Sequence, residues 1–290
     1  MRLPKPNKIV AEKYVVGLSQ FKDKAATIKL SANESALGPS PKAVKEYLRL
    51  SNNFKRYPDS EGISLRKALA KKFKLDSNRI ILGSGSDQIL ELICKVFLKK
   101  GDEVVVPKYS FLIYRLYSQM NGAKILYSKE NNFAVSVNEI LKKVSKKTKV
   151  VFLANPNNPT STYIDKKKLL FLRKRLRSNI LLVIDDAYFE YVKQKNYSSG
   201  LQLFSNFKNV VVTRTFSKIY GLAGLRVGWG YGSKEIINSL NQVKPPFNIN
   251  SPALVAAEAA IKDNVWLNKE IKHVKKWNDR FYKEFKKLNI

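Results

Sequence analysis

The stretch NVVVTRTFSK, residues 209–218, places three consecutive valines before a polar cluster that ends in Lys218. A short apolar run of this kind is typical of a strand that is buried on both faces of a parallel sheet. An ammonium group at the end of such a strand is costly unless it is solvated, paired or chemically altered. Lys218 is therefore either an ordinary surface lysine or a functional group, and the rest of the sequence has to decide between the two.

The same pattern of a short apolar run followed by polar residues recurs along the chain. The other runs are RIIL (79–82), DEVVVP (102–107), KVVFLA (149–154) and NILLVI (179–184). Stretches of helical periodicity separate them, so we predict an α/β fold with a mostly parallel, doubly wound sheet and helices on both faces. Ligands of such sheets bind at the carboxyl ends of the strands. The polar clusters GSGSD, PKYS, NPNNPT, DDAY and TFSK are therefore expected to meet in one crevice.

Composition limits the classes of protein that fit. The 290 residues, 44% of them hydrophobic, are enough for one large domain and a smaller one. The net charge of +31 is spread over nearly every helical segment, which favours solvated helix faces over a nucleic-acid-binding stripe. One cysteine, Cys94, and one histidine, His273, exclude a zinc site built from these ligands. No apolar window is long enough for a membrane span and no secretory signal is visible, so a cytoplasmic protein is expected.

Two of the polar clusters carry groups that suit an anion. Gly83 and Gly85 let the backbone approach a ligand at the start of a helix, where free N–H groups favour negative charge. Ser84, Ser86 and Ser217 add hydroxyl groups, and Arg226 adds a fixed positive charge. Together they would suit a phosphate monoester, although Gly, Ser and Asp also make ordinary helix caps.

The other clusters suit a flat, polar ring. Asp185 ends an apolar strand and needs a cation such as a protonated ring nitrogen. Asn158 and Tyr188 could hydrogen-bond a phenolic oxygen, Tyr109 could stack on the ring, and Lys218 could condense with an aldehyde. A phosphate, a pyridinium, a phenolate and an aldehyde are the groups of pyridoxal 5'-phosphate, which we predict as the cofactor. The adjacent Asp186 is expected to point away from the crevice or to cap a helix.

With these motifs in order, the sequence resembles the fold-type-I pyridoxal-phosphate-dependent aminotransferases of class II, and most closely the histidinol-phosphate aminotransferase family. The resemblance covers almost the whole chain. It rests on ANESALGPSP (32–41), RYPD (56–59), GSGSDQIL (83–90), PKYSF (107–111), NPNNPT (155–160), DDAY (185–188), RTFSKIYGLAGLRVG (214–228) and PPFNINSPALVAAEAAIKD (245–263).

The resemblance implies a role for each matching residue. Lys218 would be the Schiff-base lysine, with Asp185 and Tyr109 as the other catalytic residues, and Tyr57 would reach the phosphate from the partner subunit of a homodimer. Tyr14 matches a substrate-contacting tyrosine weakly. The implied cofactor-binding residues are Gly83, Ser84, Gly85, Tyr109, Asn158, Asp185, Tyr188, Ser217, Lys218, Arg226 and, from the partner, Tyr57.

The implied reaction belongs to histidine biosynthesis. Histidinol phosphate would give up its amino group to 2-oxoglutarate, which yields imidazole-acetol phosphate and glutamate. An aromatic or broad-specificity aminotransferase and a threonine-phosphate decarboxylase are alternatives on the same scaffold. A basic nucleic-acid-binding protein is the alternative from another class.

The resemblance also implies a domain organisation, and the chain differs from the family pattern in its length and at Ser161. We expect residues 1–45 to contribute to a small domain, residues 46–250 to form the large cofactor-binding domain, and residues 251–290 to begin the C-terminal small domain. The chain is several tens of residues shorter than the family pattern, so that small domain is expected to be incomplete. Ser161 stands where the family motif NPNNPTG has glycine, which predicts a different turn at that position.

Overall fold

The computed structural model describes residues 29–50 and 54–289, and Tyr14 lies outside these ranges. Its α-helices are α1 Pro41–Arg49, α2 Ile63–Phe73, α3 Gly85–Phe97, α4 Ile113–Met120, α5 Val137–Lys143, α6 Lys166–Arg175, α7 Gly200–Phe204, α8 Lys234–Val243, α9 Ser251–Lys262 and α10 Asn264–Lys287. Its strands are β1 Ile80–Gly83, β2 Glu103–Pro107, β3 Lys124–Ser128, β4 Glu130–Asn131, β5 Ala134–Val135, β6 Thr148–Ala154, β7 Leu181–Asp185, β8 Val210–Thr215 and β9 Gly228–Tyr231. Short 3₁₀ turns are η1 Ser77–Arg79, η2 Phe189–Tyr191 and η3 Ala223–Leu225.

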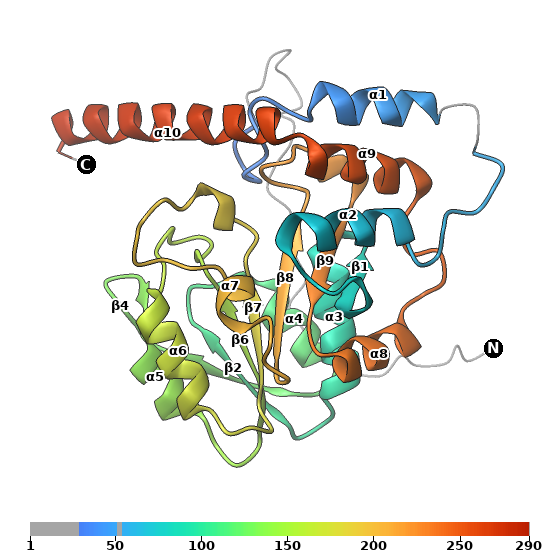
Figure 1. The fold of residues 1–290 in the computed structure, drawn as a ribbon. Coiled ribbons are helices and arrows are strands. Elements are labelled where there is room, and N and C mark those ends of the chain that lie inside the picture. The colour runs from blue at the N-terminus through green and yellow to red at the C-terminus, as the bar shows by residue number, and fades with distance from the viewer. Residues whose placement is uncertain (1–28, 51–53, 290) are drawn as a thin grey trace, which may run out of the picture.

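The main sheet confirms the predicted fold class. Seven strands lie in the order β1-β9-β8-β7-β6-β2-β3 (Figure 1). The pairs from β8 to β3 are all parallel, whereas β9 runs antiparallel to both of its neighbours. The strands expected from the apolar runs are all present to within two residues at each end. The sequence reasoning missed β9, because its residues GWGY include two glycines and carry little strand signal.

Successive side chains of the central strands pack into two separate hydrophobic layers, one on each face of the sheet. Leu182 and Val212 belong to the layer shared with α2, α5, α6, α7 and α9, while Val183 and Val211 belong to the layer shared with α3, α4 and α8. Every residue of β7 and β8 is buried. Because both faces of the strands are covered, polar groups reach open space only at the strand ends.

The C-terminal helices lie against the edge of this core. The helix α1 packs along α9, and α9 packs on α2, so segments far apart in the sequence lie side by side (Figure 1). The helix α10 extends beyond the sheet (Figure 1). The side chains of Phe281, Tyr282 and Phe285 on it are exposed. Helices were expected after NINSP, and α9 and α10 confirm them. The domain boundaries at residues 45 and 250 remain predictions. Within the described residues, no helix is both long and apolar enough to cross a membrane.

A glycine on β9 allows the sheet to approach the start of α3. A Cβ atom at Gly228 would lie 2.6 Å from the carbonyl carbon of Gly85 and would also overlap the backbone nitrogen of Ser86. No side chain fits between two backbones at that distance. We expect Gly228→Ala to lower the free energy of unfolding by about 1–3 kcal/mol, the usual cost of overpacking. Urea denaturation measures it.

The matched control is Gly224→Ala, because a Cβ at Gly224 would have no heavy atom within 4 Å. That variant should unfold at the same urea concentration as the parent chain. Equal midpoints for Gly228→Ala and the parent would show that the contact between β9 and α3 is looser than the structure has it.

Candidate active site

A cavity of about 620 Å³ lies at the carboxyl ends of the parallel strands. Four of the five predicted clusters contribute to its wall, and the fifth, PKYS, stops short of it. The wall residues from the strand ends, from the loops after them and from the starts of α3 and α4 are Ser86, Asp87, Phe111, Leu112, Tyr114, Ala154, Pro156, Asn158, Asp185, Ala187, Tyr188, Thr215, Ser217, Lys218, Ala223, Gly224 and Arg226. The segment 29–34 closes another side through Lys29, Ser31, Ala32, Asn33 and Glu34. The convergence expected from the α/β topology is therefore present.

Asp185, the last residue of β7, places a buried carboxyl group in the wall of this cavity. Its Oδ2 atom accepts a hydrogen bond from the hydroxyl of Tyr114 at 2.8 Å, and its Oδ1 atom accepts one from the backbone N–H of Ala187 at 3.2 Å. Burial raises the pKa of Asp185 to about 6, against the effect of the Tyr114 hydrogen bond. A cation in the cavity would favour the carboxylate form.

Asp186 faces the opposite way. Its Oδ2 atom accepts a hydrogen bond from the backbone N–H of Gly200 at 2.7 Å and lies 3.8 Å from Nη2 of the buried Arg214. The guanidinium of Arg214 also stacks over the ring of Phe189, 3.6 Å from its centroid. As the sequence predicted, only the first of the two adjacent acids reaches the cavity, since successive side chains of a strand point to opposite sides.

Lys218 lies in the turn after β8 and lines the same cavity as Asp185. Its Nζ atom donates a hydrogen bond to the carbonyl oxygen of Ala32 at 2.7 Å and lies 5.6 Å from the centroid of the Tyr188 ring. Burial lowers the pKa of Lys218 despite the nearby carboxylates. A larger share of its amine is therefore unprotonated near neutral pH, which is the form that attacks a carbonyl carbon.

Arg226 adds a guanidinium group to the cavity wall. Its Nη1 atom donates to Oγ of Ser217 at 3.2 Å, and its Nη2 atom lies 3.3 Å from Oδ2 of Asp87. The backbone of Arg226 is left-handed, with φ of 53°, a strained conformation that is common at functional sites. Gly85 makes room for it, since a Cβ at that position would overlap Nη2 of Arg226.

Two further predicted residues, Asn158 and Tyr188, also line the cavity. The hydroxyl of Tyr188 accepts a hydrogen bond from Nδ2 of Asn33 at 3.2 Å. Ser161, which stands in place of the motif glycine, adopts φ of 56°. This is a left-handed conformation that glycine adopts readily and serine rarely. The difference of this turn from the family motif stays a prediction.

The structure does not bring every predicted residue to the cavity. Tyr109 is 41% exposed and its ring lies 5.6 Å from the ring of Phe133, outside the wall. Gly83 and Ser84 precede the part of α3 that lines the cavity, and the backbone N–H of Ser84 donates to Gln88 instead. The physical reason is helix register: the free N–H groups that face a ligand belong to the first turn of a helix, and α3 begins at Gly85.

Among the wall residues that sequence reasoning left without a role are Asp87, Asn33 and Tyr114. Asp87 lies in the first turn of α3, directly after Ser86, which the sequence had already suggested as a hydroxyl donor to an anion. Asn33 lies in the motif ANESALGPSP, to which the sequence assigned no role. Tyr114, on α4, carries no local signal, because only the fold brings it against Asp185.

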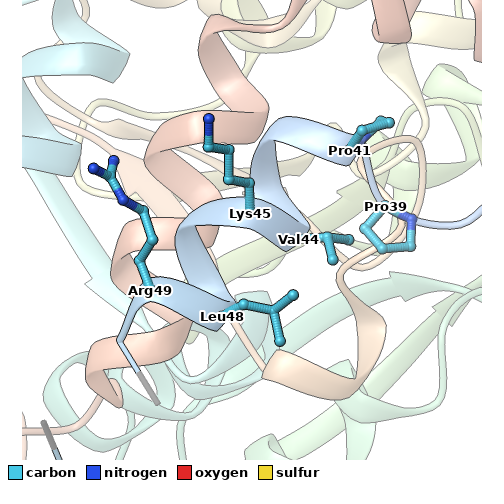
Figure 2. A pocket seen from close by; sticks show the side chains of 6 residues that line it. All are labelled: Pro39, Pro41, Val44, Lys45, Leu48 and Arg49. Atoms are coloured by element: carbon cyan, nitrogen blue, oxygen red, sulfur yellow. The ribbon is translucent and has the colours of Figure 1, made fainter. Parts of the chain in front are cut away.

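Two other hollows lie nearby. One of about 1070 Å³ adjoins the cavity, shares Asn158 and Tyr188 with it, and extends to Trp277 of α10. The other, of about 600 Å³, lies along α1 (Figure 2). It is as large as the cavity but is lined only by Pro39, Pro41, Val44, Lys45, Leu48 and Arg49. With no acid, hydroxyl or amide side chain in its wall, the hollow on α1 offers no catalytic chemistry. Among the described residues, no group of His, Cys, Asp or Glu side chains is placed to hold a metal ion.

Comparison with known proteins agrees with this geometry. The family model of aminotransferase class I and II matches residues 25–290. The chain therefore belongs to the class I and II aminotransferases.

Similar proteins show to which family within this class the chain belongs. The chain is 54% identical over 290 residues to the histidinol-phosphate aminotransferase of Pelagibacter ubique (strain HTCC1062), covering all of this chain and 81% of that protein. It is 42% identical to the histidinol-phosphate aminotransferase of Rhodopseudomonas palustris (strain BisA53), covering 99% of this chain and 79% of that protein. The crystal structure of histidinol-phosphate aminotransferase from Sinorhizobium meliloti in complex with pyridoxal-5'-phosphate matches with a TM-score of 0.83 and 25% identity, covering 86% of this chain and 68% of that one. Within the class, the chain belongs to the histidinol-phosphate aminotransferases.

Proposed function

We propose that the cavity binds pyridoxal 5'-phosphate and catalyses the transfer of the amino group of histidinol phosphate to 2-oxoglutarate, a step of histidine biosynthesis. The observation that carries the proposal is the joint placement of Lys218, Asp185 and Arg226 in one cavity wall. An amine of lowered pKa, a buried carboxylate and a guanidinium suit the aldehyde, the ring nitrogen and the phosphate of this cofactor. The membership of the chain in the histidinol-phosphate aminotransferases supports the choice of substrate.

The residues present fit the cofactor. The side chains of Arg226 and Ser217 and the backbone N–H groups of Ser86 and Asp87, in the first turn of α3, would hold the phosphate. Asp185 would face the ring nitrogen, because among the described residues it is the one buried carboxylate that lines the cavity. Asn158 and Tyr188 would lie at the phenolic oxygen. Tyr109 as a stacking residue would require its ring to leave Phe133.

The chemistry that bound pyridoxal phosphate supplies is an aldehyde for the amino group and a ring that takes up negative charge. Lys218 would hold the cofactor and, once released from it, carry a proton to or from the substrate α-carbon. Its depressed pKa suits this work, since the amine must accept a proton near neutral pH. Asp185 would keep the ring nitrogen protonated throughout.

The adjoining hollow would receive the substrate side chain. Aromatic residues line it, among them Tyr163, Tyr191 and Trp277. Such a lining suits an imidazole ring, and it also suits the ring of phenylalanine or tyrosine. An aromatic amino-acid aminotransferase is for this reason the second candidate.

We further propose that the enzyme works as a homodimer in the cytoplasm. Tyr57 is 82% exposed and does not contribute to the cavity of its own chain. A tyrosine of this kind could serve the phosphate site of a second copy.

The experiment that tests the function combines a spectrum with a substrate titration. Pyridoxal phosphate added to the protein should give an absorbance band that borohydride abolishes. Histidinol phosphate should change that band at lower concentration than phenylalanine does. A stronger response to phenylalanine would favour the second candidate, and no band at all would refute the proposal.

Tyr114→Phe tests the environment of Asp185. Removal of the hydroxyl takes one hydrogen bond from a buried carboxylate, so the pKa of Asp185 should rise. Because the hydrogen bond is made to a charged group, we expect the dissociation constant of pyridoxal phosphate to increase about tenfold at neutral pH. The pH at which binding is half lost should also move upward.

Tyr117→Phe is the matched control, because Tyr117 lies on the same helix but not in the cavity wall. It should leave both quantities unchanged. A Tyr114→Phe protein that binds the cofactor with the affinity and pH dependence of the parent would show that the hydroxyl does not support Asp185.

A further inference from the structure

We propose that Phe247 is a positioning residue that orders Tyr57 for the phosphate site of a second copy of the chain. The two rings stack on each other, with centroids 4.6 Å apart and planes inclined by 17°. This inference rests on the proposed homodimer in which Tyr57 acts across the interface.

The exposure of the pair indicates that it is not part of a core. Tyr57 is 82% exposed and Phe247 is 43% exposed, so neither ring gains much from burial in its own chain. Among the described residues, Phe247 provides the one ring contact of Tyr57, and no hydrogen bond to its hydroxyl is present. The hydroxyl is therefore free to bind a group outside the chain, and the stacking fixes the ring that carries it.

The backbone of Phe247 indicates that this arrangement is imposed. Its φ is 54°, a left-handed conformation that a bulky residue rarely adopts. Strain of this kind persists only where the surroundings enforce it, and it concentrates at functional sites. The strained backbone of Phe247 therefore holds its ring against Tyr57, although neither side chain is buried.

The loop on either side of Phe247 is anchored. On one side, Nζ of Lys244 donates to the carbonyl oxygen of Ser60 at 3.0 Å, which ties the loop to the segment that carries Tyr57. On the other side, Nδ2 of Asn248 donates to the carbonyl oxygen of Leu82 at 3.2 Å and to Oε1 of Gln88 at 2.6 Å. Gln88 in turn accepts the backbone N–H of Ser84. The loop thus connects Tyr57 with the start of α3, where the chain would hold its own phosphate.

Phe247→Leu is the direct test, because leucine keeps apolar bulk and removes the stacking. We expect the dissociation constant of pyridoxal phosphate to rise about three- to tenfold, which corresponds to the usual free energy of an aromatic pair. Phe247→Tyr keeps the stacked ring and should have the dissociation constant of the parent. Phe171→Leu, which removes another exposed phenylalanine far from the site, should have no effect. In a Tyr57→Phe background, Phe247→Leu should add nothing, since it acts through the Tyr57 hydroxyl.

Mixed dimers distinguish action across the interface from action within one chain. One subunit carries Lys218→Ala, so borohydride can trap the cofactor only on the other subunit. Phe247→Leu placed in the Lys218→Ala subunit should weaken trapping, because that subunit supplies Tyr57 to the competent site. Placed in the subunit that keeps Lys218, it should leave trapping unchanged.

The opposite pattern, or equal trapping in both mixed dimers, would overturn the role of Phe247 while leaving the proposed function in place. A parent protein that binds the cofactor as a monomer would overturn the shared site, and with it this inference. A parent protein that shows no cofactor band would refute the proposed function itself. Sedimentation and the spectrum of the parent separate these last two results before any variant is made.

Discussion

We expect Lys218→Ala to abolish covalent attachment of pyridoxal phosphate and all transamination, the largest effect of any substitution considered. Lys218 is one of two lysines in the cavity wall among the described residues, and burial lowers its pKa toward the reactive amine form. Borohydride reduction followed by peptide mass spectrometry measures the attachment. The parent chain should carry the cofactor on the peptide that contains Lys218, and the variant should carry none.

Lys29, the second lysine of the wall, provides the control. Its Nζ atom lies 2.6 Å from Oε1 of Glu34, and a paired ammonium is a poor nucleophile. Lys29→Ala should therefore retain attachment at Lys218. Cofactor trapped on Lys29, or on any other lysine of the parent chain, would show that Lys218 has been assigned wrongly.

Asp185→Asn is expected to lower the rate of transamination by about 10³-fold, the scale found when a preorganised charge is removed from an active site. The amide cannot hold the ring nitrogen in its protonated form, so the ring takes up less charge.

The affinity of the protein for the cofactor should also depend on pH through Asp185. Because burial sets the pKa of Asp185 to about 6 in the free protein, its carboxylate is lost as the pH falls through that value. Cofactor affinity should therefore be constant well above pH 6, should be about halved near pH 6 and should decline further below it, and Asp185→Asn should remove the decline.

Asp186→Asn is the neighbouring control, and its effect should fall on stability. Asp186 is buried and accepts from Gly200 beside Arg214, so its loss leaves a buried guanidinium without its carboxylate. We expect a decrease of about 3 kcal/mol in the free energy of unfolding, with cofactor binding retained in the folded fraction. If Asp186→Asn cost more catalytic rate per folded molecule than Asp185→Asn, the assignment of the two acids would have to be reversed.

The sequence by itself determined the fold class and most of the chemistry. Apolar runs such as NILLVI have the length and pattern of strands buried on both faces, and these properties are local. The position of Asp185 at the end of such a run also fixed which of two adjacent acids would face the cavity, because strand side chains alternate. Lys218, Ser217 and Arg226 followed from the same reasoning and from the family resemblance.

Only the tertiary structure decided the features that depend on distant contacts. The strand β9 carries little signal of its own and forms because β1 and β8 flank it on both sides. Tyr114 meets Asp185 across 71 positions of sequence, and Tyr57 meets Phe247 across a longer separation. Tyr109 lies outside the cavity wall because its ring packs on Phe133. The local sequence pattern indicates whether a segment forms a helix or a strand. It does not indicate which distant side chain a residue contacts, because packing between residues far apart in the chain decides which segments meet.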